Sequence, residues 1–516
     1  MTRIFVKLVL GGITGKILGI VREVLLAALF GAGKVVAAQR IALTGTMVPI
    51  NFFTADALSA GFLPMYVQYR QDRPAMAAVL YRNVRNILVG FSVVLVLALV
   101  LGRNYWVAVL GPGLDGETAS MAASMLVIAG LGMPFYIQYN MYVLVGLAHD
   151  DTRMFNIRPS FQSIGLIAAT LVAYFSGHAS VLAWGFTGPY VLLCALGTFW
   201  THQRRYLHVP VVDGTGIHLS YRVARRTALT LFWKRLRPLL LIPLILQGSI
   251  AVERAVGSLL GVEVVAATEY SRFIVDSCMA LLAAPLGLAG LTSFAKMAAH
   301  EVSGGLKRLV PPVLLLTIPL SLVLTINAKG IVTLAYARGQ FDERAVDISS
   351  VMLVGFALGI WAQVIGYTLV KILNARGANF RVAIVNAAAF GSAILVNLLL
   401  YRFWGAFTLG AASSICGLLM FALSAHWLGV LRFSLVRLAE LAPGAALAGV
   451  TGWLLAGDGI VRLVASCAAI GVLFLGYVAA VPPLRHAYLD SFLRRLRRKP
   501  DISDNDQATP AVRSNA

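Results

Sequence analysis

The amino-acid sequence predicts an all-α polytopic membrane protein. Of its 516 residues, 59% are hydrophobic and only 13% are charged, whereas a soluble domain has about a quarter of its residues charged. Apolar runs of about 20 residues, the length that a helix needs to cross a bilayer, recur along the chain. Most of the 43 lysines and arginines lie in alternate breaks between these runs. These three observations exclude a soluble enzyme or binding domain.

The apolar runs predict about fourteen transmembrane helices. The first group covers residues 8–30, 35–69, 84–110, 119–148, 157–176 and 181–201. The second group covers residues 239–260, 267–295, 309–335, 348–373, 382–400, 406–429, 435–456 and 460–481. Because Lys16 and Arg22 interrupt the first run and no small-residue cleavage site follows it, we predict a retained helix instead of a secretory signal.

The second run, residues 35–69, is long and contains helix breakers. Gly45, Pro49, Gly61 and Pro64 divide it. We therefore expect it to bend or break beside a cavity, as helices do in transporters that alternate their access. Close packing of small residues between helices would explain the glycines equally well.

The spacing of the runs predicts two lobes and an addition. The predicted segments are an N-terminal six-helix lobe (1–203), a basic cytoplasmic linker (204–238), a second six-helix lobe (239–430), two additional helices (431–484) and a basic, then disordered tail (485–516). The two lobes show weak sequence similarity, because residues 144–155 align with residues 369–380. This similarity favours two pseudo-symmetric lobes.

Membrane topology accounts for the net charge of +21. If the spans alternate, the basic residues gather on one side, and the positive-inside rule then places both termini in the cytoplasm. The basic excess predicts contact with anionic membrane lipids and no nucleic-acid partner. Part of the linker, residues 221–233, is best explained as a topology signal, with a basic helix lying on the inner leaflet as the alternative.

Ionisable residues stranded inside the apolar runs are the strongest indication of function. They are Lys16, Arg22, Glu23, Arg40, Glu253, Arg254, Arg272 and Lys371. A charge at the centre of a membrane helix costs roughly 2.5 to 3.5 kcal/mol, so these residues are expected to face a protein interior or a wet cavity. Because the cations exceed the acids and arginine suits phosphate oxygens, we predict a central cavity that binds an anion. The alternative is a set of interhelical salt bridges only.

Nothing in the sequence predicts covalent chemistry. It has no Gly-rich phosphate loop and no metal-ligand spacing, and its four cysteines stand singly in apolar runs. We therefore expect no cofactor, no metal and no disulfide, and a transporter instead of an enzyme. A cation-coupled drug exporter would show a lone buried acid, and a membrane glycosyltransferase would need large external loops. A scaffold that transports nothing is the third alternative.

Several motifs together resemble the MurJ (MviN) family of lipid-linked oligosaccharide flippases. The opening match is GIVREVLLAALFGAG at residues 19–33, followed by Arg40-Ile41 and by SAGFLP at residues 59–64. The resemblance continues in order with YSR (270–272), APLG (284–287), RGQFD (338–342) and LNARG (373–377). It covers most of the chain and agrees with fourteen spans.

The resemblance implies a member of the multidrug/oligosaccharidyl-lipid/polysaccharide (MOP) exporter superfamily, with two six-helix lobes around a central cationic cavity. Family members of this type flip lipid II, an undecaprenyl-diphosphate-linked saccharide, from the inner to the outer leaflet. By motif position, Arg22 with Glu23 and Arg272 take the diphosphate-binding roles, and the last two helices form a groove for the lipid tail. We expect a monomer in the bacterial inner membrane.

The chain also departs from the family pattern in its second span. Where the family commonly carries two cations, this sequence has Asn51-Phe52, with Asp56-Ala57 following, and Ala42 replaces a usual proline. Our hypothesis is that Arg254 supplies the lost charge from the seventh span. The loss leaves room for another polyprenyl-diphosphate-linked saccharide, such as an exopolysaccharide or O-antigen repeat unit.

Overall fold

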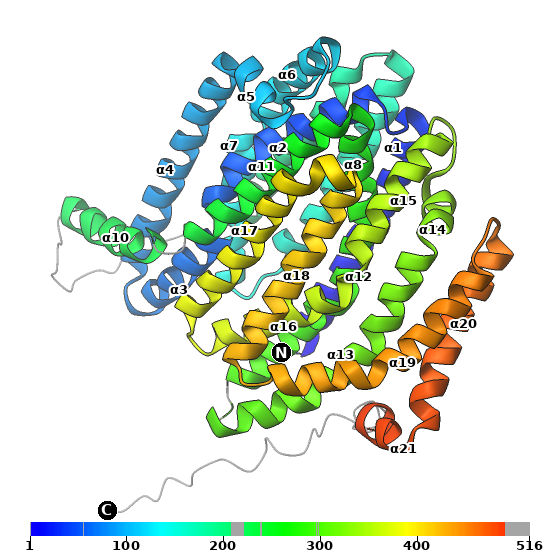
Figure 1. Cartoon of the computed structure of the whole chain (residues 1–516). Helices are drawn as coiled ribbons and strands as arrows, with labels where there is room; N and C mark the ends of the chain where they lie inside the picture. Colours follow the sequence, from blue (N-terminus) through cyan, green and yellow to red (C-terminus); the bar gives the residue numbers. More distant parts are fainter. Residues whose placement is uncertain are drawn as a thin grey trace, which may run out of the picture.

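The computed structural model describes residues 2–54, 56–207, 221–237, 240–295, 297 and 299–490. Every regular element in this part of the chain is helical (Figure 1). The predicted all-α fold class is therefore confirmed. The side chain of Asp56, part of the predicted linker and most of the predicted tail lie outside the described residues.

The first group of helices, which we call the N-lobe, precedes the linker. It contains α1 (Thr2–Phe30), α2 (Lys34–Thr54), α3 (Asp56–Asp72), α4 (Pro74–Leu101), α5 (Arg103–Leu110), α6 (Gly116–Gly130), α7 (Met133–Ala148), α8 (Arg153–Ser176), the 3-10 turn η1 (Ala179–Ala183) and α9 (Trp184–Gln203). Helix α1 packs along α8, α2 along α6, and α9 along both α7 and α8. The long second span predicted from the sequence corresponds to two helices, α2 and α3.

The second group of helices, which we call the C-lobe, packs mainly within itself. It contains α11 (Leu241–Leu260), α12 (Val262–Ala295), α13 (Ala299–Ile326), α14 (Ala328–Tyr336), α15 (Glu343–Ala357), α16 (Ile360–Ala375), α17 (Asn379–Trp404) and α18 (Phe407–Trp427). Helix α12 packs against α15 and α16, and α18 packs against α15, α16 and α17.

Three further segments lie outside the lobes. The linker helix α10 (Tyr221–Leu236) packs against α3 and α4. Helices α19 (Leu431–Leu455) and α20 (Ile460–Ala480) pack on each other and against α13 at one flank of the bundle (Figure 1). Short turns α21 (Pro482–Leu484) and η3 (Arg485–Asp490) follow.

Eight helices in the described part of the chain are long and apolar enough to cross a membrane. Two bent pairs, α6 with α7 at 42° and α15 with α16 at 48°, raise this number to ten. The charge-bearing helices α1, α2, α11 and α12 are not among the ten. The count of fourteen spans therefore stays a prediction.

Two predicted spans end too late, because a helix boundary lies within an apolar run. Residues 84–110 were predicted as one span, but α4 ends at Leu101 and α5 begins at Arg103, with Gly102 between them. Residues 309–335 likewise divide at Asn327 into α13 and α14. Hydropathy does not detect such a break, since the segments on both sides of it are apolar.

Gly45 of α2 has a packing role. The indole Nε1 of Trp106 donates a 3.0 Å hydrogen bond to the Gly45 carbonyl oxygen. A Cβ atom at this position would lie 2.9 Å from Leu126 Cδ1 and 3.0 Å from Trp106 Nε1. Of the two explanations for the glycines, close packing is therefore the one that applies at Gly45.

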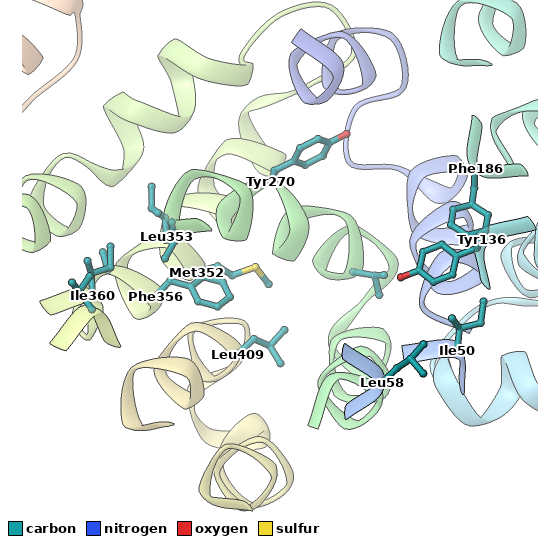
Figure 2. Close-up of a cluster of buried hydrophobic side chains, with 14 of the residues drawn as sticks. Ile50, Leu58, Tyr136, Phe186, Tyr270, Met352, Leu353, Phe356, Ile360 and Leu409 are labelled. Carbon is teal, nitrogen blue, oxygen red and sulfur yellow. The ribbon is translucent and has the colours of Figure 1, made fainter. Parts of the chain in front are cut away.

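Buried apolar side chains from both lobes form a continuous core (Figure 2). In the C-lobe, Phe356 and Leu353 of α15 lie near Leu409 of α18. In the N-lobe, Tyr136 of α7 lies beside Phe186 of α9, with ring centres 6.2 Å apart. Because lipid tails are as apolar as these side chains, close packing and interhelical hydrogen bonds stabilise such contacts.

The two lobes are joined at the end of the molecule that the sequence predicts to be periplasmic. The Gln340 backbone amide donates a 2.9 Å hydrogen bond to the Ala28 carbonyl. The Tyr270 hydroxyl donates a 2.9 Å hydrogen bond to the Gly31 carbonyl, and the Gly113 amide donates one of 3.1 Å to Ser258 Oγ. The N-terminus lies toward the opposite end of the bundle from α5 (Figure 1).

Gly339 makes this junction possible, and its replacement should weaken the junction. Its φ is +61°, and an added Cβ would lie 2.1 Å from the Ala28 carbonyl oxygen. We expect Gly339→Ala to push the lobes apart at this end, because backbone atoms cannot move aside as a flexible side chain does. Oxidative cross-linking of cysteines introduced at positions 28 and 340 should fall several-fold in this variant.

Gly377→Ala is the matched control for this experiment. Gly377 also has a positive φ, +71°, but an added Cβ would contact no atom within 4 Å. Both variants should therefore lose about 1 kcal/mol through backbone strain, and only Gly339→Ala should lose the cross-link. Equal cross-linking in the two variants would show that this junction does not depend on Gly339.

Candidate functional site

Glu23 of α1 accepts hydrogen bonds from two arginines, one on its own helix and one on α2. Arg22 donates to Glu23 Oε1 from Nε at 3.0 Å and from Nη2 at 2.6 Å. Arg40 of α2 donates to Oε2 at 2.5 Å. Both carboxylate oxygens are thereby used, and the Glu23 side chain is only 2% exposed. The carboxylate neutralises part of the positive charge that the two arginines bring into the bundle.

The C-lobe has two further ion pairs, each between α11 and α12. Arg254 of α11 contacts Glu269, and Arg272 of α12 contacts Glu253. The Arg254 guanidinium also donates to Thr44 Oγ1 of α2 at 3.0 Å, which connects the two lobes. Each acidic or basic residue of α11 therefore pairs with the opposite charge on α12.

These two groups meet at the boundary between the lobes. We call them together the interface cluster; its members are Arg22, Glu23, Arg40, Glu253, Arg254, Glu269 and Arg272. The Arg40 guanidinium lies 5.9 Å from the ring centre of Tyr270. Arg22 and Lys16 each lie 5.9 Å from the ring centre of Phe273. The structure thus brings residues predicted from opposite lobes into one place.

Gly19 allows α1 and α12 to approach each other within this region. An added Cβ at Gly19 would lie 3.3 Å from the Phe273 ring. Because Lys16, Gly19 and Arg22 follow each other at three-residue intervals, they share one face of α1. The Phe273 ring therefore lies opposite the glycine, between two cations.

Arg22 and Arg272 have the most exposed side chains among the four arginines of the interface cluster. The side chain of Arg22 is 20% exposed and that of Arg272 is 27% exposed, whereas those of Arg40 and Arg254 are each 8% exposed. Arg22 and Arg272 are therefore the accessible pair, and Arg40 and Arg254 are the buried pair.

The region is closer to neutral than the sequence predicted. Glu269 and Asp276 of α12 were not among the predicted residues, and both lie near Arg272. Residues 269, 272 and 276 share one helix face, a spacing that is visible in the sequence. With these two carboxylates included, the excess of cations at the lobe boundary is small.

Two predicted residues lie apart from the interface cluster. Lys371 is on α16, where its ammonium lies 5.2 Å from the ring centre of Tyr367. Asn51 is on α2, and its Oδ1 accepts a 3.2 Å hydrogen bond from the Tyr136 hydroxyl. The predicted contribution of Asp56 lies outside the described side chains.

Arg158 of α8 is a further partly buried cation, which was not among the residues predicted from the sequence. Its Nε donates to the Tyr190 hydroxyl at 3.1 Å, its Nη1 to Asn140 Oδ1 at 2.9 Å and its Nη2 to the Tyr136 hydroxyl at 3.0 Å. The guanidinium carbon lies 4.9 Å from the Tyr136 ring centre. Arg158 is the second residue of the predicted span 157–176, so it lies at the end of an apolar run and not within it.

Comparisons of the sequence with known proteins find matches to one family along most of the chain. A family model described as lipid II flippase MurJ matches residues 26–457. The probable lipid II flippase MurJ of Synechocystis sp. is 25% identical over 473 residues, which cover 85% of this chain and 84% of that protein. The probable lipid II flippase MurJ of Rhizobium meliloti is 25% identical over 378 residues, which cover 69% and 67%, respectively.

Solved structures show the same fold. A lipid II flippase MurJ in an inward closed conformation superposes with a TM-score of 0.78 at 17% identity, covering 95% of this chain and all of that one. A multidrug resistance MATE family transporter of the MOP superfamily, in an inward-facing conformation, superposes with a TM-score of 0.63 at 13% identity. That match covers 81% of this chain and 96% of the transporter.

Proposed function

We infer that this chain, which belongs to the lipid II flippase MurJ family, translocates lipid II from the inner to the outer leaflet of the bacterial inner membrane. It is a multi-pass membrane protein of the MOP superfamily fold. The observation that carries the proposal is the accessible pair Arg22 and Arg272, contributed by opposite lobes at their boundary.

We propose that Arg22 and Arg272 bind the diphosphate of the lipid headgroup. A guanidinium presents a planar fork of donors that matches phosphate oxygens and stays charged when poorly solvated. The less exposed Arg40 and Arg254 hold Glu23 and Glu269 in place and so position the accessible pair. Lys16, beside the same Phe273 ring as Arg22, adds a further positive charge.

The pairing of Arg272 with Glu253 suggests how binding and movement are coupled. A diphosphate that approaches Arg272 competes with this carboxylate for the same donors, and it does so at the boundary between the lobes. We propose that this exchange loosens the hydrogen bonds that join the lobes at their predicted periplasmic end. The lobes then rock apart around the bound headgroup, as expected for alternating access, and no covalent bond is made or broken.

We also propose that both termini are cytoplasmic and that α10 lies on the inner leaflet. The helix buries Ala228, Phe232 and Leu236 at four-residue intervals, whereas Arg225, Arg226, Trp233 and Lys234 are exposed. A helix with one buried face and an exposed basic face that includes tryptophan is typical of an interfacial position at anionic lipids.

Reconstitution with defined lipids tests the proposed function. Purified protein in vesicles should expose lipid II at the opposite leaflet faster than vesicles without protein do. An undecaprenyl-diphosphate-linked exopolysaccharide repeat unit serves as the competing substrate. If the protein moves only the exopolysaccharide-linked lipid, its substrate carries a saccharide other than that of lipid II. If neither lipid is moved, the proposed function is wrong.

A further inference from the structure

Arg158 differs from every arginine of the interface cluster, because it makes no ion pair with a carboxylate of the described residues. Within the described part of the chain its partners are two tyrosine hydroxyls and the side-chain oxygen of Asn140. An unneutralised cation inside a membrane bundle is costly and is usually met by a partner or by a functional ligand. Its two aromatic neighbours, Tyr136 and Tyr190, offset only part of this cost.

Among the described residues, Arg158 and its neighbours have more hydrogen-bond donors than acceptors that receive them. A guanidinium has five N–H groups, and three of those of Arg158 are used. The oxygen of Asn140 accepts from Arg158, and that of Asn51 accepts from Tyr136. Both amide oxygens therefore serve as acceptors within the group, and the two NH₂ groups do not take part in these hydrogen bonds. These NH₂ groups and the unused guanidinium N–H groups are donors beside a positive charge, an arrangement that suits an oxyanion.

The residues that carry the spare donors are the more exposed members of this group. Arg158, Asn140 and Asn51 are each partly exposed, whereas Tyr136 and Tyr190 are only 4% and 0% exposed. Figure 2 shows the Tyr136 hydroxyl directed away from Phe186, toward the region between the lobes. Tyr136 and Tyr190 are thus the buried members of the group, and Arg158, Asn140 and Asn51 are its partly exposed members.

The site is displaced from the interface cluster toward the predicted cytoplasmic end. Asn51 follows Arg40 by eleven residues on α2, which corresponds to about 16 Å at the helical rise of 1.5 Å per residue. Pro159, next to Arg158, contacts Gly15 of α1, where an added Cβ would lie 2.7 Å from it. Gly15 precedes Glu23 by eight residues, or about 12 Å.

We propose that Arg158, Asn140 and Asn51 form a second oxyanion-binding subsite for the translocated headgroup, which rests on the function proposed above. The oxyanion has two possible sources. One is a carboxylate on the headgroup's peptide, bound while the diphosphate is held at Arg22 and Arg272. The other is the diphosphate itself, bound before it reaches that pair.

Two substrates distinguish these sources in reconstituted vesicles. The probes are lipid II with free peptide carboxylates and lipid II whose peptide carboxylates are amidated. For Arg158→Gln we expect the apparent KM for the first probe to rise roughly tenfold, the loss typical of one charge-assisted hydrogen bond. If Arg158→Gln leaves the KM for the amidated probe unchanged, the oxyanion bound at the subsite is the peptide carboxylate. If the KM rises equally for both probes and the melting temperature is unchanged, the bound oxyanion is the diphosphate.

Asn51→Asp supplies a second variant that does not remove the guanidinium. It keeps the shape of the side chain and places a carboxylate one hydroxyl away from Arg158. If the subsite binds an oxyanion, this variant should raise the KM as Arg158→Gln does and leave the melting temperature unchanged or higher. A merely structural arginine would be stabilised by the new carboxylate without any change in KM, and that result would overturn the proposal.

Arg153→Gln is the matched control, because Arg153 lies on the same helix but is 61% exposed and pairs with Asp151. It should leave the KM for both probes unchanged. The subsite proposal is overturned if Arg158→Gln behaves like this control, or if it lowers only the maximal rate together with the melting temperature. Failure of the wild-type protein to move either probe would instead contradict the proposed function.

Discussion

Replacing Arg272 with alanine is expected to reduce the exposure of lipid II at the outer leaflet by roughly 10- to 100-fold. Arg272 is the more exposed of the two accessible arginines, and a hydrogen bond from a charged donor contributes about 1.5 to 3 kcal/mol. The rate of headgroup translocation in vesicles, measured at saturating and at limiting lipid II, separates lost binding from lost movement. The translocation rate of Arg272→Lys should lie between the rates of the wild type and of Arg272→Ala, because lysine keeps the charge but lacks the planar guanidinium.

The double variant Arg272→Ala with Glu253→Gln shows whether the loss arises from substrate binding or from folding. Arg272→Ala alone leaves the Glu253 carboxylate without its partner, which by itself destabilises the protein. The second substitution removes that charge and should restore the melting temperature. If transport returns with it, Arg272 acts only through its salt bridge; if transport stays low, the guanidinium contacts the substrate as proposed.

Glu23→Gln is expected to cause the largest loss of stability among single substitutions in the interface cluster. The carboxylate is 2% exposed and accepts hydrogen bonds from two arginines of different helices. Its neutralisation leaves both guanidinium groups uncompensated, and breaking a buried ion pair in this way costs about 3 to 5 kcal/mol. The free energy of unfolding, measured in detergent by chemical denaturation, should fall by this amount.

Glu117→Gln provides the comparison at an exposed ion pair. Glu117 contacts Lys34 at 2.6 Å, but its side chain is 67% exposed, so its loss should change the free energy of unfolding by less than about 1 kcal/mol. Similar stabilities of the two variants would mean that solvent reaches Glu23 and screens its charge. The importance assigned here to that carboxylate would then be wrong.

The fold class and the helices that carry the buried charges follow from the amino-acid sequence alone. Apolar runs of membrane-spanning length and alternating basic loops predict an all-α membrane protein, because the bilayer requires both features. The stranded charges also identified α1, α2, α11 and α12, since a charge inside an apolar run has few tolerable surroundings. Motifs such as YSR at residues 270–272 added the family.

Which of these charges neutralise each other depends instead on how the helices pack. Glu253 and Arg254 are adjacent in sequence, yet each pairs with a residue of α12, and Arg254 is largely occupied by Glu269 and Thr44. It is therefore poorly placed to replace the cations absent near Asn51, whereas Arg158 is one hydroxyl away from that residue. Hydropathy is a property of one segment, but ion pairing depends on how neighbouring helices are rotated, and that rotation exists only in the packed bundle.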